Sequence, residues 1–500
     1  MSNAACRHKP SSNHRAIVIG SGFGGLAAAL RLRAKGYAVT VLERCENPGG
    51  RAQVFEHGGY RHDAGPTVIT APFLFSELFE LFNKKIEDYV EFVPLKPWYR
   101  FCYTDGDTFD YGGTLEDTLK EIRRIEPRDE AGYLRLLKHS KKIFDVGFTK
   151  LAEQPFHNCY KMLYEIPRLA RLRFDRTVWQ FVSHHVTSDK IRRAFSIPPL
   201  LVGGNPFETT SIYGLIHYLE RKWGVYFTMG GTGRLVQALT TLMYEEGIQL
   251  CLNTTVEEIV LSGYKANGVR LANGEMLHAD IIVTNTDPLH LYTKMLPQNK
   301  ISTGAKRKLR SRKSMGLFVL YFGTDRTYPD IAHHTIWLGE QFRELLNDIF
   351  HSKIVPRDFS LYIHRPTATD QSFAPEGHDS FYVLCPVPNL DSQIDWKSEG
   401  PRLQERIIQK LDETILPKLK THIMSPFHMT PKDFAHDYLS VGGAGFSIAP
   451  HFTQSAWFRF HNRAEGIQNL YLVGAGTHPG AGLPGVISSA KVIDKLVDNV

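Results

Sequence analysis

The stretch that decides the fold reads Ala16-Ile-Val-Ile19, Gly20-Ser-Gly22-Phe-Gly-Gly25, a helical segment, and Val39-Thr-Val-Leu-Glu43. An apolar strand leads into a glycine turn, the turn opens a helix, and a second apolar strand follows. Gly20 permits the tight turn, Gly22 lets the backbone approach a pyrophosphate, and Gly25 lets the helix pack closely on the strand. The order of these parts predicts a Rossmann-type βαβ unit that binds a dinucleotide.

Two neighbouring features narrow the ligand. Glu43 lies at the end of the second strand, where a carboxylate accepts hydrogen bonds from ribose hydroxyls and repels a 2′-phosphate. The helix N-terminus offers N–H groups to the phosphates, and Gly36 is placed to end the helix. Pro48-Gly49-Gly50-Arg51 follows directly, and Gly-Gly-Arg after the ribose acid is typical of flavoproteins. The sequence therefore predicts an FAD site.

Composition limits the other classes of function. The chain has 500 residues, 42% hydrophobic and 22% charged, which predicts an ordinary globular protein with two or three structural units. The net charge of +7 suits an anionic membrane surface or nucleic acid, but no nucleic-acid-binding motif accompanies it. The six cysteines have no C-x-x-C spacing and are predicted to be free thiols in a reducing compartment.

The predicted FAD-binding domain is discontinuous and comprises residues 14–75, 227–285 and 441–500, after a disordered tail at 1–13. Residues 76–226 are expected to form a helix-rich region that meets substrate and membrane, and residues 286–440 a substrate-binding domain. Asn267-Gly268 and Asn273-Gly274 are hairpin turn signals in the second block. The uncharged stretch 466–490 is broken by glycine and proline, and predicts strand, loop and helix rather than a membrane span.

Two further patterns in the sequence bear on function. Basic residues interleaved with aromatic ones run from Lys161 to Arg193, and this segment is either a solvated helix face or a surface for anionic lipid headgroups. The pairs His184-His185 and His333-His334 have no i, i+4 partner or carboxylate pattern, and neighbours in a strand point apart. We therefore expect no metal.

Beyond the fingerprint, several motifs resemble those of the bacterial and fungal type of phytoene desaturase, a family of FAD-dependent carotenoid desaturases. The resemblance spans nearly the whole chain, and its most specific motif is Gly474-Ala-Gly-Thr-His-Pro-Gly-Ala-Gly-Leu-Pro-Gly485. It also covers Asp63–Thr70, Leu201–Pro206, Trp223-Gly-Val225, Gly230–Gln237 and Thr453–Phe458. Within the family, the middle section is most similar to enzymes that convert C40 phytoene to lycopene.

The resemblance implies a flavoprotein that introduces successive double bonds into phytoene, bound peripherally to the cytoplasmic side of the cell membrane. Electrons would leave FAD for a quinone or oxygen, because no second βαβ unit is present for NAD. His478 is a weak candidate for an acid or base, and a role in holding the glycine loop is favoured. FAD contacts are implied at Gly20, Gly22, Gly25, Glu43, Gly50, Arg51, Val256, Gly476 and Val486.

Several alternatives stay open at this point. Another carotenoid desaturase would act on a C30 substrate or stop at neurosporene. A flavin amine oxidase, ketolase or isomerase could use the same scaffold, although residues 470–490 contain neither Cys nor Trp for the site that an amine oxidase would show. A prenyl carrier of the Rab-GDI type would share the architecture without a flavin, and the intact ribose acid argues against it.

Overall fold

The amino-terminal strand, glycine loop, helix and strand form in the predicted order. This computed structural model describes residues 14–156, 167 and 172–500. Strand β1 (Arg15–Ile19), helix α1 (Phe23–Ala34) and strand β2 (Ala38–Leu42) open a five-stranded parallel sheet of order β19-β13-β1-β2-β9. The other strands are β9 (Gln249–Cys251), β13 (Ile281–Thr284) and β19 (Leu470–Leu472). The fold class is thus α/β with a Rossmann-type sheet.

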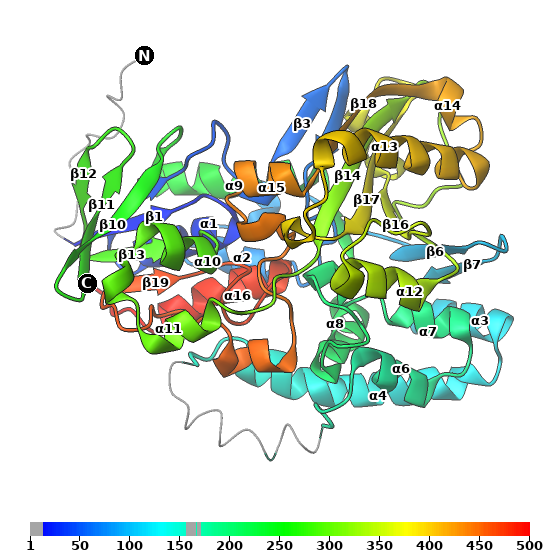
Figure 1. The fold of residues 1–500 in the computed structure, drawn as a ribbon, viewed down its shortest axis with the longest axis horizontal. Coiled ribbons are helices and arrows are strands. Elements are labelled where there is room, and N and C mark those ends of the chain that lie inside the picture. The colour runs from blue at the N-terminus through cyan, green and yellow to red at the C-terminus, as the bar shows by residue number, and fades with distance from the viewer. Residues whose placement is uncertain (1–13, 157–166, 168–171) are drawn as a thin grey trace.

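Glycines shape the first crossover as the sequence predicts. Gly20 has a φ of +89°, and a Cβ on Gly25 would lie 2.0 Å from the Gly20 carbonyl oxygen. Gly36, with a φ of +98°, follows the last turn of α1. Helix α1 is buried on nearly all sides, because it lies between the sheet and the helices α2 (Phe73–Glu80), α9 (Gly231–Glu245) and α16 (Leu483–Asp494). These elements gather in one half of the molecule (Figure 1).

An antiparallel meander of three strands extends this half of the molecule. One of the two turns predicted for this region is absent from it. It contains β10 (Val256–Ser262), β11 (Lys265–Leu271) and β12 (Met276–His278). Asn273-Gly274 lies between β11 and β12, as predicted. The prediction of a turn at Asn267-Gly268 is wrong, because both residues lie inside β11. Gly268 is needed there for close approach, since a Cβ would lie 2.5 Å from the Leu277 carbonyl oxygen.

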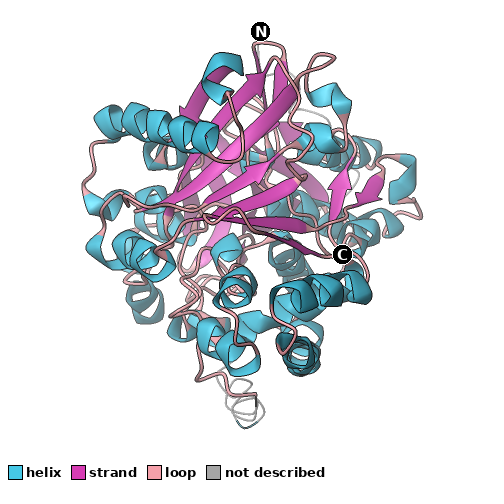
Figure 2. Ribbon diagram, turned by 90° about the vertical axis from the view of Figure 1, so that its right-hand side faces the viewer, coloured by secondary structure: helices cyan, strands magenta, loops and turns pink. Residues whose placement is uncertain are grey.

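A second, seven-stranded sheet fills the other half, and its strands cross the centre of Figure 2 with helices around them. Its order is β18 (Ile423–Met429), β14 (Gly316–Thr324), β17 (Asp379–Val387), β16 (Leu361–His364), β15 (His334–Leu338), β6 (Tyr99–Tyr103) and β7 (Thr108–Tyr111). All its neighbouring pairs are antiparallel except β15 and β6. Strands β6 and β7 come from the region 76–226, so that region contributes to both sheet and helices. The division into domains stays a prediction.

Two short ribbons join the halves. Strands β3 (Val54–His57) and β4 (Tyr60–Asp63) form a hairpin that packs against β17, and β5 (Phe92–Pro94) pairs with β8 (Tyr226–Thr228). A group of helices lies beneath the second sheet in Figure 1: α3 (Leu115–Ile125), α4 (Asp129–Val146), α6 (Val178–His185), α7 (Asp189–Phe195) and α8 (Leu215–Trp223). Among the described residues, the other α-helices are α10 (Pro288–His290), α11 (Thr303–Lys308), α12 (Phe342–Asn347), α13 (Trp396–Glu413), α14 (Leu419–His422) and α15 (Pro431–Asp437).

Two properties of the chain bear on the expectations above. Over the described ranges, none of the helices combines the length and the apolar character that crossing a bilayer requires. Cys45, Cys102 and Cys385 are free thiols, as predicted. The same prediction is wrong for Cys251, which is disulfide-bonded, because disulfide partners need no fixed spacing along a sequence.

Candidate cofactor and substrate site

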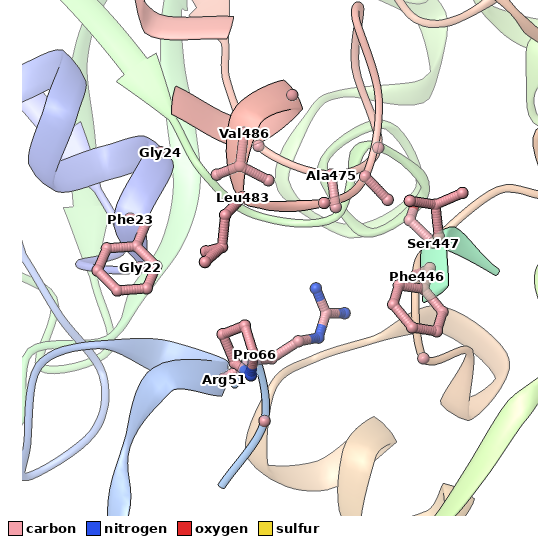
Figure 3. A pocket seen from close by; sticks show the side chains of 18 of the residues that line it. Gly22, Phe23, Gly24, Arg51, Pro66, Phe446, Ser447, Ala475, Leu483 and Val486 are labelled. Atoms are coloured by element: carbon pink, nitrogen blue, oxygen red, sulfur yellow. The ribbon is translucent and has the colours of Figure 1, made fainter. Parts of the chain in front are cut away.

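A cavity of about 580 Å³ runs from the glycine fingerprint to the second sheet (Figure 3). Eight of the nine residues expected to contact FAD line it: Gly20, Gly22, Glu43, Gly50, Arg51, Val256, Gly476 and Val486. Gly25 does not line the cavity, and instead packs against the Gly20 carbonyl group. Residues that are far apart in sequence thus meet on one continuous wall.

The fingerprint loop presents a bare helix end to the cavity. Gly22 is the N-cap of α1 and provides no side-chain hydrogen bond to the first turn. The first N–H groups of a helix have no partner within the helix, and they carry a partial positive charge. An uncapped helix end facing a cavity is therefore suited to hold a diphosphate.

Glu43 is fixed at the end of β2 by three donors. Its Oε2 accepts hydrogen bonds from the Ser21 amide and the Ser21 hydroxyl, both at 2.7 Å, and its Oε1 accepts one from the Cys45 amide at 2.9 Å. The side chain is 6% exposed. A carboxylate has about four acceptor positions, so Glu43 is rigidly placed and can still accept from a ligand hydroxyl.

The guanidinium of Arg51 projects into the cavity between Pro66 and the carboxy-terminal loop (Figure 3). Its Nη2 donates to the Ser440 hydroxyl at 3.2 Å, whereas its Nε has no partner. Burial lowers the pKa of Arg51, and the nearby Asp287 opposes that shift. Burial likewise raises the pKa of Asp287, whose Oδ2 is also without a partner. The two side chains leave hydrogen-bonding capacity facing a polar ligand.

Buried side chains brace the carboxy-terminal glycine loop from behind. Arg459, 1% exposed, donates to the carbonyl oxygens of Ala475 at 2.6 Å and Thr477 at 3.0 Å, and more weakly to two others. Asn462 donates to the His478 carbonyl oxygen at 2.8 Å. The loop places Leu483 and Val486 opposite Arg51 (Figure 3). Its shape is therefore set by side chains outside the glycine motif.

His478 lines the cavity, but its ring is engaged elsewhere. The Nε2 atom lies 3.1 Å from the Leu151 carbonyl oxygen and donates to it, and the ring stacks edge-on against Phe156. Burial lowers the pKa of His478 to about 4. This arrangement favours the expected role in holding the loop.

The far part of the cavity is apolar. Aliphatic and aromatic side chains from α8, from the segment before it and from the second sheet form this wall: Leu200, Leu201, Ile212, Leu215, Leu219, Ile336, Leu361, Tyr362, Tyr382 and Leu384. Glu220 is an exception, and it accepts a hydrogen bond from the Tyr99 hydroxyl at 2.9 Å. Burial raises the pKa of Glu220 to about 7. A long hydrocarbon fits this wall, and the raised pKa of Glu220 favours the neutral carboxyl that an apolar wall requires.

Sequence reasoning missed two residues of this site. Asn285 directly follows β13. A Cβ added at Gly22, Gly24 or Gly474 would lie only 2.5–2.7 Å from an atom of the Asn285 side chain. Asn285 therefore joins the fingerprint to the carboxy-terminal loop. Arg459 is the other, one position after the motif that ends at Phe458. Neither lies in a local pattern, although an arginine in an apolar context was a signal available at Arg459.

The histidine pairs differ from each other in the structure. His184 and His185 lie at the end of α6, and His185 contacts His139. His333 and His334 lie beside His364, and potential ligand atoms of the three are within 4.8 Å of one another. The expectation of no metal considered only neighbours in sequence and did not include His364. Of the basic segment, Lys161, Arg168 and Arg171 lie outside the described residues.

Comparisons with known proteins agree with this geometry. The chain matches the family described as flavin containing amine oxidoreductase over residues 23–492. It is 46% identical over 488 residues to a phytoene desaturase (lycopene-forming) of Pseudescherichia vulneris, covering 97% of this chain and 99% of that protein. It is 45% identical over 476 residues to the Pantoea ananas protein of the same name, covering 95% and 97%. An oxidoreductase from Methanosarcina mazei shares the fold, with a TM-score of 0.65 at 16% identity, over 96% of this chain and all of that one.

Proposed function

The chain belongs to the family of flavin-containing amine oxidoreductases, and we propose that it is an FAD-dependent desaturase that converts phytoene to lycopene in carotenoid biosynthesis. Family membership confirms the predicted flavin cofactor. One observation carries the proposal for the substrate: the cavity that begins at the dinucleotide fingerprint continues into an apolar wall on the second sheet. The two relatives reported above are both named phytoene desaturase (lycopene-forming), and this supports the same substrate.

We assign the polar end of the cavity to FAD. The uncapped start of α1 fits a diphosphate, because its first N–H groups face the cavity and have no partner within the helix. Glu43 is placed to accept hydrogen bonds from the adenine ribose, and the backbone of Val256 is placed to contact the adenine ring. Arg51 has an unpartnered Nε in the cavity and fits a polar edge of the cofactor. Gly476 and Val486 would lie against the flavin ring.

When bound, FAD supplies a two-electron acceptor for a hydride lost from an allylic carbon. The protein aligns a hydrocarbon in the channel, since the far wall gives it mostly apolar contacts. Loss of hydride leaves a delocalised cation whose adjacent C–H is strongly acidic. We therefore assign no essential base, and the Asp287, His478 and Glu220 side chains keep structural or positioning roles.

The membrane and the electron acceptor belong to the same proposal. A C40 hydrocarbon is almost insoluble, because each exposed CH₂ costs roughly 0.8 kcal/mol, so the substrate must come from a bilayer. Leu151 and Phe452 line the cavity and also belong to a small apolar cluster that includes Phe174. Phe174 lies in the basic segment, near residue 172, where the described part of that segment begins. We propose that this face meets anionic lipid on the cytoplasmic side, and that a quinone or oxygen reoxidises the flavin.

The test mixes the FAD-loaded protein with phytoene in vesicles under anaerobic conditions. Bleaching of the flavin band without NAD or NADP, and its return on adding a quinone or oxygen, is expected. The extracted pigment should be lycopene, whereas neurosporene or a C30 product would revise the substrate or end point. A flavin that stays oxidised until a nicotinamide is added would overturn the proposal.

Lipid binding is measured separately, by sedimentation with vesicles that contain or lack anionic lipid. Arg173 and Arg176 are described and exposed or partly so, and Arg173 pairs with Asp175 at the surface. Reversing the charge at Arg168, Arg171, Arg173 and Arg176 should release the protein from vesicles and leave FAD bound. Unchanged sedimentation would remove this segment from the proposal.

A further inference from the structure

A buried cluster of three histidines and one aspartate lies behind the cavity wall. His334 begins β15 and His364 ends β16, and the two are directly opposite each other in the antiparallel pair. His333 precedes His334, and its ring centroid is 4.8 Å from that of His364. His334 and His364 are fully buried, and His333 is 6% exposed. The sheet thus fixes three imidazoles around one point.

Asp63, at the end of β4, completes the cluster from the other half of the molecule. Its Oδ2 lies 3.7 Å from Nε2 of His364. Its Oδ1 accepts hydrogen bonds from the amide and hydroxyl of Thr232, both at 3.0 Å, and the side chain is 1% exposed. The carboxylate is therefore held by one oxygen, and its other oxygen faces His364.

Five polar atoms of the cluster have no hydrogen-bond partner. These are Nε2 of His333, Nε2 of His334, both ring nitrogens of His364, and Oδ2 of Asp63. A buried polar atom without a partner is costly, and natural proteins rarely leave such a set unsatisfied. A cation at the centre would satisfy one nitrogen of each histidine and the Asp63 oxygen at once.

Two of the three histidines, His333 and His334, make with Nδ1 the kind of contact that orients metal ligands. Nδ1 of His333 is 2.7 Å from the Thr369 hydroxyl, and Nδ1 of His334 is 2.8 Å from the Tyr362 hydroxyl, which in turn contacts Thr67. Metal-binding histidines commonly use the second nitrogen this way, which leaves Nε2 for the ion.

We propose that His333, His334, His364 and Asp63 bind a divalent transition-metal ion of the zinc class. Three imidazoles and one carboxylate are a donor set that Zn²⁺ accepts in tetrahedral geometry, with bonds of about 2.0–2.2 Å. Potential ligand atoms of the three histidines lie within 4.8 Å of one another, and Oδ2 of Asp63 lies 3.7 Å from Nε2 of His364. The imidazole nitrogens need to approach one another by roughly 1–1.5 Å to reach that geometry. The ion would tie the β3–β4 hairpin to strands β15 and β16.

The experiment uses the full-length, FAD-loaded protein. After dialysis against metal-free buffer, elemental analysis should find about one zinc-class ion per chain, and chelator treatment should lower the unfolding temperature. Co²⁺ added to chelator-treated protein should give tetrahedral d–d bands at longer wavelength than the flavin. Protein that holds no ion after purification and gives no Co²⁺ bands would overturn the proposal.

Variants locate the ion. His364→Gln, His334→Gln and Asp63→Asn should each lower the metal content at least tenfold while FAD remains bound. The matched control is His217→Gln, because His217 is buried in α8 with both ring nitrogens unpartnered and lies outside the cluster. The assignment would be contradicted if the cluster variants kept the ion. It would also be contradicted if the His217→Gln control lost as much of the ion as the cluster variants do. If a cluster variant does not fold, the Co²⁺ titration of the wild-type protein still decides.

Discussion

Glu220 should make the stability of the protein fall as pH rises. Burial raises the pKa of this carboxyl from 4.5 to about 7, partly opposed by the Tyr99 hydrogen bond. Between these pH values the folded protein holds a proton that the unfolded chain has lost, so raising the pH favours unfolding. The difference corresponds to about 3 kcal/mol in total, at 1.36 kcal/mol per pKa unit. The loss is nearly complete at about pH 8, one unit above the folded-state pKa.

Replacing Glu220 with Gln removes the titration and retains an acceptor for the Tyr99 hydroxyl. The free energy of unfolding is measured in urea at about pH 5 and about pH 8. Between these two pH values, we expect the difference between variant and wild type to shift by about 2–3 kcal/mol in favour of the variant. The other titrating groups cancel in this comparison. Glu413→Gln, which changes an exposed glutamate, serves as the control. Wild-type and Glu220→Gln curves that stay parallel would refute the assigned protonation of Glu220.

Three further predictions concern the cofactor site. Glu43→Ala should weaken FAD binding by on the order of 1.5–3 kcal/mol, measured by equilibrium dialysis of the flavin, and unchanged affinity would contradict the ribose assignment. Gly25→Ala should destabilise the fold by about 1–3 kcal/mol, because its Cβ would lie 2.0 Å from the Gly20 carbonyl oxygen; in urea unfolding, Gly274→Ala, with open space around it, should cost less. Arg459→Lys should loosen the carboxy-terminal loop and speed FAD release on dilution, because one ammonium group cannot donate to the four carbonyl groups that Arg459 reaches. A variant that releases FAD at the wild-type rate would show that the loop keeps its shape without these hydrogen bonds.

The sequence predicted those parts of the fold whose signals are local. The turn at Gly20 and the end of α1 at Gly36 each need a positive φ, and the glycine that supplies it is visible in the sequence. The strand, loop and helix after Leu470 could be read in the same way. Asn267-Gly268 failed because the same dipeptide serves a turn or a close strand contact, and the Leu277 carbonyl that decides between them lies on another strand.

Residues that act across long sequence separations were not predictable. Asn285 meets the fingerprint loop only after β13 pairs beside β1, and Arg459 reaches its carbonyl partners only when the loop folds over it. His364 joins His334 through strand pairing, which no spacing rule reveals. One sequence cannot contain these contacts as patterns, because the sheet order sets them.

The polar end and the apolar end of the cavity come from different halves of the molecule, so the site exists only when the halves are joined. Few elements make that junction, and the β3–β4 hairpin is one of them. Asp63 ends this hairpin, and it faces His364 on the second sheet with an unpartnered oxygen. An ion there would hold the apolar wall in place relative to the fingerprint. Because alignment of a hydrocarbon with the flavin is the main catalytic requirement proposed for this fold, removing the ion should impair desaturation before it releases FAD.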